Sequence, residues 1–267
     1  MSDRKAGTAV SGALHAEWTK LRTVGGTFWL LLAVAVLTTA LSTAAVAAMR
    51  CPAGGCSVDT AKLSLTGVQL GQAVVAVLAV LAMGTEYSTG MIRTTLTAMP
   101  RRTVVLTAKA TIVTAAVLVA ATAGVLGSVL AGRLILPGHG FTTPHGYLPL
   151  SLSDGPTLRA AGGSVLYLAL IALLSLGIAT LVRDSAAAIG TVLGLLYLSP
   201  ILIQVVTDPA WRRHLQQIAP SNAGLLIQAT TGLHGLPISP WAGLAVLTAW
   251  AAGALTAGAG LLHLRDA

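Results

Sequence analysis

The chain has 267 residues, of which 55% are hydrophobic and 9% charged, and its formal net charge is +8. Soluble globular domains carry about 25% charged residues, so this composition excludes the usual water-exposed protein surface and predicts that a lipid bilayer is the solvent. The basic excess is explained by residues that meet anionic lipid at the membrane surface, and we expect no nucleic-acid partner.

The first predicted element is a short amphipathic helix in the segment LHAEWTKLRT, residues 14–23. Three residues share an apolar face by their i, i+4, i+7 spacing: Leu14, Trp18 and Leu21. The polar residues lie largely elsewhere: Glu17, Lys20 and Arg22. Tryptophan suits the headgroup level and basic residues suit anionic lipid. We therefore expect an interfacial helix that lies flat before the first span, with a plain polar N-terminal tail as the alternative.

Six apolar segments reach the roughly 20 residues needed to cross a hydrocarbon core about 30 Å thick. Their approximate bounds are 28–49, 63–83, 110–136, 160–182, 185–206 and 241–264. Each is predicted to be a helix, because lipid offers no water to the backbone amides. The second segment is the weakest, since it carries Gln69 and Gln72.

The predicted fold class is an all-α integral membrane protein with six transmembrane helices in one domain. Residues 1–26 form the N-terminal part, residues 27–264 the bundle and residues 265–267 the tail. The first segment starts late and is long for the apolar region of a signal peptide, although STAAVAA within it resembles a cleavage site.

The positions of Lys and Arg near the span ends predict the orientation. Six spans place both termini on one side, which holds the larger group: Arg4, Lys5, Lys20, Arg22, Arg93, Arg101, Arg102, Lys109, Arg183 and Arg265. The other side holds the smaller group: Arg50, Lys62, Arg133, Arg159, Arg212 and Arg213. We therefore expect a multi-pass protein of the cell membrane with both termini in the cytoplasm.

Two cysteines, Cys51 and Cys56, lie in CPAGGC in the first outer loop. Outside the reducing cytoplasm such a pair is predicted to form a disulfide, with two free thiols as the alternative. We expect no metal site, because His139 and His145 have no Cys, Asp or Glu at ligand spacing.

Two features of the last third of the chain concern packing. The segment SNAGLLIQATTG, residues 221–232, is too apolar for a free loop and too short to span. It is predicted to be a re-entrant or interfacial helix before the sixth span, capped by Ser221 or Asn222. The motif GTVLG, residues 190–194, permits close helix contact within the subunit or across a dimer seam.

The sequence carries no recognisable motif for ATP hydrolysis, ion coupling or catalysis. It has no GxxxxGK[ST] phosphate loop, and no lysine is followed by Ser or Thr. No acidic residue lies at the centre of a span, where an ion-coupled carrier typically has an ionisable side chain. We therefore expect a non-enzymatic chain that holds no cofactor of its own and depends on a partner for energy.

The segment GTEYSTGMIRTTLTAMPRR, residues 84–102, gathers polar groups between the second and third spans. Topology requires basic residues but neither an acid nor an aromatic, so this loop is predicted to contact a cytoplasmic partner. The contact residues are predicted to be Glu86, Tyr87, Thr89, Gly90, Ile92 and Arg93. Gly90 permits a tight turn, and a poorly hydrated Glu86 at the membrane edge would attract a partner's arginine. Arg101, Arg102 and Lys109 are explained by lipid contact alone.

Four segments together resemble the membrane-spanning permease subunits of ABC-2-type ABC transporters. They are EWTKLRT (17–23), GTEYSTGMIRTTLTAMPRR (84–102), APSNAG (219–224) and LLHLRDA (261–267). The resemblance implies that two six-span subunits, identical or sister chains, form an export path for lipids, polysaccharides, drugs or peptides. It also implies two separate ATP-binding subunits that hold ATP and Mg. The N-terminal helix would be the connecting helix, and the 84–102 loop would supply the coupling helix. Unlike larger relatives, the chain carries no fused ATPase and no large outer domain.

Three alternatives remain beside this interpretation. A secondary carrier would show two inverted halves of three spans, but the intramembrane charges typical of that class are missing. A membrane enzyme acting on lipid would need a metal or carboxylate constellation, which the sequence does not show. A non-transporting accessory, sensor or immunity subunit fits the same composition.

Overall fold

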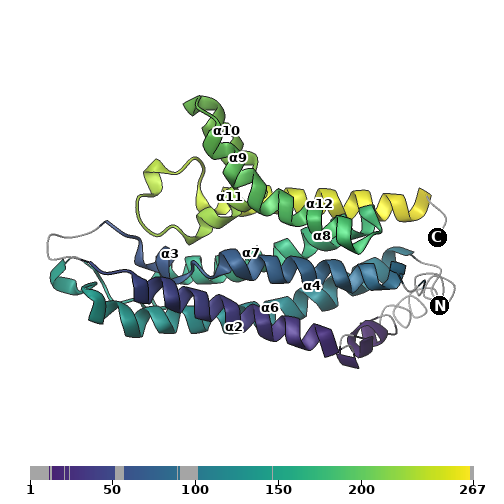
Figure 1. The fold of residues 1–267 in the computed structure, drawn as a ribbon, viewed down its shortest axis with the longest axis horizontal. Coiled ribbons are helices and arrows are strands. Elements are labelled where there is room, and N and C mark those ends of the chain that lie inside the picture. Colours follow the sequence, from purple (N-terminus) through teal and green to yellow (C-terminus); the bar gives the residue numbers. More distant parts are fainter. Residues whose placement is uncertain are drawn as a thin grey trace, which may run out of the picture.

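The computed structural model describes residues 12, 14–20, 22–23, 25–51, 57–88, 90, 102–145 and 147–264. Every regular element among these residues is a helix, and Figure 1 shows long helices running side by side. Six are long and apolar enough to cross a membrane: Gly25–Ala48, Val68–Tyr87, Thr103–His139, Gly155–Val182, Ser185–Val205 and Pro240–Leu262. The prediction of an all-α chain with six membrane-spanning segments is confirmed in this respect.

The long helices are α2 (Gly25–Ala48), α4 (Val68–Ser88), α6 (Arg102–Ile135), α7 (Gly155–Val182) and α12 (Pro240–Leu264). The fifth segment consists of α8 (Ser185–Leu193), a π-helical turn (Gly194–Leu198) and α9 (Ser199–Val205). Short helices complete the chain: α3 (Thr60–Ser64), α10 (Pro209–Ile218) and α11 (Pro220–Leu225). There are also 3-10 turns at Leu136–His139, Thr143–His145, Leu226–Gln228 and Leu233–Gly235.

Helix α7 is the centre of the bundle, and it packs against α4, α6, α8 and α12. Small residues let these helices approach closely. A Cβ atom added at Gly177 would lie 2.7 Å from the backbone of Ala254 in α12. The faces of α2, α9 and α12 that carry Trp29, Ile201 and Trp241 are exposed, as expected of outer helices that meet lipid or another subunit.

Of the two glutamines that weaken the second span, the side chain of Gln72 is accommodated by a tyrosine from another helix, whereas Gln69 is exposed. Gln72 is buried and accepts a hydrogen bond from the Tyr167 hydroxyl on α7. The backbone carbonyl of Gln69 accepts one from the Tyr197 hydroxyl in the π-helical turn. Interhelical bonds of this kind satisfy polar groups that lipid would leave unpaired, so α4 remains a continuous helix.

The fifth segment is irregular where Pro200 removes a backbone donor near the start of α9. A π-helical turn precedes it, as is common where the regular hydrogen-bond ladder is interrupted. A Cβ atom at Gly190 or Gly194 would meet nothing within 4 Å. Neither glycine of GTVLG is therefore needed to make room for a neighbouring helix of this subunit, and the dimer seam stays a prediction.

The region before the sixth span differs from the expected helix over residues 221–232. Helix α11 begins at Pro220 after Ala219 and has no side-chain cap, so the prediction of a Ser221 or Asn222 cap is wrong. The physical reason is that proline at the first helical position is already fixed in a helical conformation. Helix α11 packs against α12 and is largely buried, whereas α10 projects away from the long helices (Figure 1).

At the end of the bundle that carries α3, Asp59 joins the loop after α2 to the loop before α12. Its carboxylate accepts bonds from the Thr230 amide (2.5 Å), the Thr230 hydroxyl (2.7 Å), the Thr231 amide (3.0 Å) and the Lys62 amide (3.0 Å). Burial alone would raise the pKa of Asp59, but these hydrogen bonds outweigh it and lower the pKa below its usual value.

We predict that Asp59→Asn destabilises the chain by about 1 kcal/mol at pH 7, because a half-buried carboxylate with several donors is only partly screened by solvent. Since the folded pKa is depressed, the stabilisation is present above the unfolded value and is lost as the pH falls through the folded value. Denaturation of both proteins in micelles at pH 7 and at about pH 3 tests this. The gap should narrow in acid, and a gap independent of pH would contradict the assignment.

Candidate functional site

The most polar part of the bundle lies at the end where α4 finishes and α6 begins. Figure 1 places the N-terminal segment (residues 14–23) and the last turns of α12 at this same end. An even number of spans requires this arrangement. The loop between α4 and α6, with its predicted partner contacts, emerges from these two helix ends.

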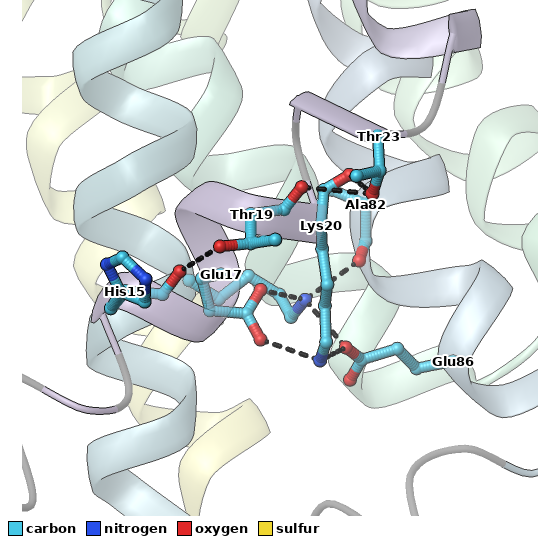
Figure 2. A network of polar contacts seen from close by, with 8 residues as sticks. His15, Glu17, Thr19, Lys20, Thr23, Ala82 and Glu86 are labelled. Carbon is cyan, nitrogen blue, oxygen red and sulfur yellow. Dashed lines mark hydrogen bonds and ion pairs between the residues drawn. The ribbon is translucent and has the colours of Figure 1, made fainter.

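Four charged side chains form an ionic cluster here: Glu17, Lys20, Glu86 and Lys109. Figure 2 shows Glu17 and Lys20 on the N-terminal segment facing Glu86 on α4. Lys20 Nζ lies 2.9 Å from Glu17 Oε1 and 2.7 Å from Glu86 Oε1. Lys109 Nζ lies 2.7 Å from Glu17 Oε2 and 3.0 Å from Glu86 Oε1. Two acids and two bases thus alternate, and the ionic cluster is neutral.

Lys109 is the centre of the ionic cluster. Its side chain is only 4% exposed, and its ammonium also donates to the Ala82 carbonyl at 3.1 Å. Together with Glu17 and Glu86, this carbonyl gives the ammonium's three N–H donors one acceptor each. Desolvating a charge in this way is tolerable only when partners of opposite charge surround it, so Lys109 holds α6, α4 and the N-terminal segment together.

Glu86 is less completely paired. Its Oε1 atom accepts bonds from both lysines, whereas its Oε2 atom is buried without a hydrogen-bond partner. A buried acceptor without a partner costs free energy. Within the ionic cluster, every N–H donor of Lys109 therefore has an acceptor, whereas one carboxylate oxygen of Glu86 lacks a donor.

Lys20 is the exposed member of the ionic cluster, with a side-chain exposure of 36%. Burial alone would lower the pKa of Lys20, but the hydrogen bonds and charges of Glu86 and Glu17 outweigh it and raise the pKa above its usual value. Lys20 thus stays protonated across the physiological range and closes the ionic cluster toward solvent.

The structure shows where some of the predicted partner contacts lie. Glu86 and Tyr87 belong to the last turns of α4 rather than to a loop. Glu86 is 2% exposed and meets two lysines of its own chain, so this structure does not present its carboxylate to a partner's arginine. Gly90 adopts a positive φ of 70°, in agreement with the predicted turn. Thr89, Ile92 and Arg93 lie outside the described residues.

The N-terminal segment is helical where it is described. Its polar side chains, however, do not all face away from the bundle, as the amphipathic interpretation expected. Glu17 is 6% exposed and Trp18 is 46% exposed, so the acid turns toward the bundle. Arg22 is exposed, as expected for lipid headgroups. Glu17 is therefore buried against the bundle, although the amphipathic interpretation placed it on the polar face. Its burial is tolerable because its carboxylate is paired with Lys20 and Lys109.

Lys109 and Arg183 were predicted only as topology signals, and the structure gives both a specific contact. Arg183 ends α7 in a left-handed conformation (φ 62°). Its guanidinium lies 5.6 Å from the centre of the Tyr87 ring and donates weakly, at 3.5 Å, to the Leu261 carbonyl. It therefore links the ends of α4, α7 and α12. The available sequence signal was a basic residue in the very short connection between two spans, VRDS.

A pocket of about 190 Å³ adjoins the ionic cluster. Its walls come from the N-terminal segment and from α2, α4 and α6. The four side chains of the ionic cluster border one part, and mainly apolar side chains such as Leu30, Leu78 and Val113 border the rest. The arrangement can receive a small molecule with a polar head and an apolar body.

Two further predictions concern chemistry elsewhere in the chain. Cys51 is disulfide-bonded, whereas Cys56 lies outside the described residues, so its pairing stays a prediction. No group of three or more His, Cys, Asp or Glu that could hold a metal occurs among the residues that the structure describes. His139 instead contacts the Met49 carbonyl at 3.1 Å.

The chain was compared with protein-family models and with curated proteins. Neither a protein-family model nor a curated protein matches the chain.

Proposed function

We propose that the chain is the permease subunit of an ATP-driven exporter of the ABC-2 type in the cell membrane. In this proposal two such subunits, identical or sister chains, form the path, and separate ATP-binding subunits carry ATP and Mg. The 84–102 loop docks on the ATP-binding subunit from the cytoplasm. Six apolar helices and the four segments that resemble this family support the proposal.

The ionic cluster is the observation that carries it. The loop that would meet the ATP-binding subunit joins α4 to α6, and the ionic cluster fastens both helix ends to the N-terminal segment that precedes α2. A displacement of this loop would therefore move three spans together. Binding of the ATP-binding subunit can drive transport only if it favours one of two arrangements of the bundle. Rigid coupling of three helix ends would transmit such a preference from the loop to the spans.

The test is purification of the tagged full chain from its own membranes in mild detergent, with measurement of ATPase activity and protein stoichiometry. We expect a stoichiometric chain with a phosphate loop, and we expect Arg93→Glu to remove it. Arg213→Glu is the matched control, because it makes the same charge change on α10, at the exposed opposite end. A well-behaved preparation without any ATPase, or equal loss with both variants, would contradict the proposal.

A secondary carrier is the second candidate, and one observation favours it. Glu86 and Lys109 are charged and buried near the ends of two candidate spans, and ionisable side chains within spans are a feature of ion or proton pathways in carriers. Transport that survives ATP depletion but collapses with the ion gradient would favour this candidate.

A further inference from the structure

We infer that the pocket beside the ionic cluster binds a linear amphiphile whose head group donates a hydrogen bond to Glu86. This site is independent of the proposed transport function, because it is built by one chain and can be measured without an ATP-binding subunit.

The head group is indicated by the unpaired atom of Glu86. This side chain borders the pocket and is 2% exposed, and its Oε2 atom has no hydrogen-bond partner. The lysines do not supply the missing donor: both meet Oε1, and the Lys109 ammonium already meets Glu17, Glu86 and the Ala82 carbonyl. A carboxylate oxygen is an acceptor, so the complementary group is an N–H or O–H donor.

The body of the ligand is indicated by the pocket walls. Beyond the charged side chains and two threonines, Thr27 and Thr85, the walls are apolar. The apolar side chains come from three helices: Leu30 of α2, Leu78 and Leu81 of α4, and Ile112 and Val113 of α6. The volume of about 190 Å³ is below the roughly 300–1,000 Å³ that holds a drug-sized ligand. A single linear chain suits this space better than a polycyclic molecule does.

The net charge of the ionic cluster indicates which property of the head group is recognised. Because the two acids and two bases cancel, the pocket has no net charge that would demand a cation. The decisive property is therefore the donor itself, in a primary amine or a hydroxyl. The same chemistry is offered by the aminoethyl head of phosphatidylethanolamine and by a free alkylamine.

The test uses native mass spectrometry of the purified full chain with three probes that share one twelve-carbon tail. Dodecylamine and dodecanol each carry a donor, whereas dodecyltrimethylammonium carries the charge without a donor. We expect one retained adduct with each of the first two probes and at least about tenfold weaker retention of the third, the loss expected for one hydrogen bond to a charged group. Equal retention of all three would overturn the proposal.

Two glycines at the start of α2 provide matched variants. Gly26 borders the pocket and Gly25 does not, and a Cβ atom at either position meets nothing within 4 Å. We expect Gly26→Leu to fill the pocket and abolish retention of dodecylamine, while Gly25→Leu retains it. Glu86→Gln, which replaces one acceptor by an amide, should weaken retention as well. Undiminished binding by Gly26→Leu would place the amphiphile elsewhere and overturn the assignment.

The natural source is distinguished by lipid composition. In nanodiscs of phosphatidylethanolamine, whose head carries N–H donors, a lipid ligand would already occupy the pocket and compete with dodecylamine. In phosphatidylcholine, whose head carries none, dodecylamine should bind freely. Competition only in phosphatidylethanolamine identifies the lipid, equal binding in both identifies a free amphiphile, and failure to bind in either overturns the proposal.

Discussion

Replacing Lys109 by Met should destabilise the chain by about 3–5 kcal/mol, the cost of leaving buried charges without their partner. Lys109 is 4% exposed and lies within 3.0 Å of both Glu17 and Glu86. Without it the ionic cluster keeps two carboxylates and one ammonium, so its net charge falls from zero to −1 in a poorly hydrated place. The free energy of unfolding in mixed micelles, measured by denaturant titration, reports the loss.

Two controls separate charge balance from lost packing. Lys109→Met combined with Glu86→Gln restores a neutral ionic cluster and should recover part of the stability, because neighbouring substitutions couple strongly. Lys62→Met, at an exposed position of α3, should change stability by no more than about 0.5 kcal/mol. If the double variant were less stable than Lys109→Met alone, the ionic cluster would not be the source of the effect.

Replacing Gly177 by Ala should cost about 1–3 kcal/mol through overpacking between α7 and α12. The added Cβ would lie 2.7 Å from the backbone atoms of Ala254 and Leu255. A backbone cannot rotate away as a flexible side chain can, so the two helices must separate. The same denaturant titration measures the change.

The matched control lies in the same helix. Gly162→Ala adds the same methyl group to α7, but its Cβ would meet nothing within 4 Å. It should be neutral or stabilising by up to about 1 kcal/mol, because alanine has the better helix propensity. Equal destabilisation by both substitutions would show that the cost comes from α7 itself and not from its contact with α12.

The polar end of the bundle was only partly predictable. The sequence pointed to residues 84–102 because an acid and an aromatic there exceed what topology needs, and the structure indeed places Glu86 and Tyr87 at the polar end of α4. It did not reveal that Glu86 is buried against Lys20 and Lys109. Periodicity assigned Glu17 to a polar face, but it could not say that this face turns toward the bundle.

The sequence by itself determined that this chain is a bundle of six apolar helices, and it approximated their bounds. This follows because bilayer thickness sets the length of a span and the absence of water forces each span to satisfy its own backbone. Both are local constraints. Only the tertiary structure decided which polar residues meet, since Glu17, Glu86 and Lys109 come from segments far apart in the chain. Their pairing depends on how α4 and α6 pack, and that packing creates both the buried charges and the unpaired oxygen of Glu86.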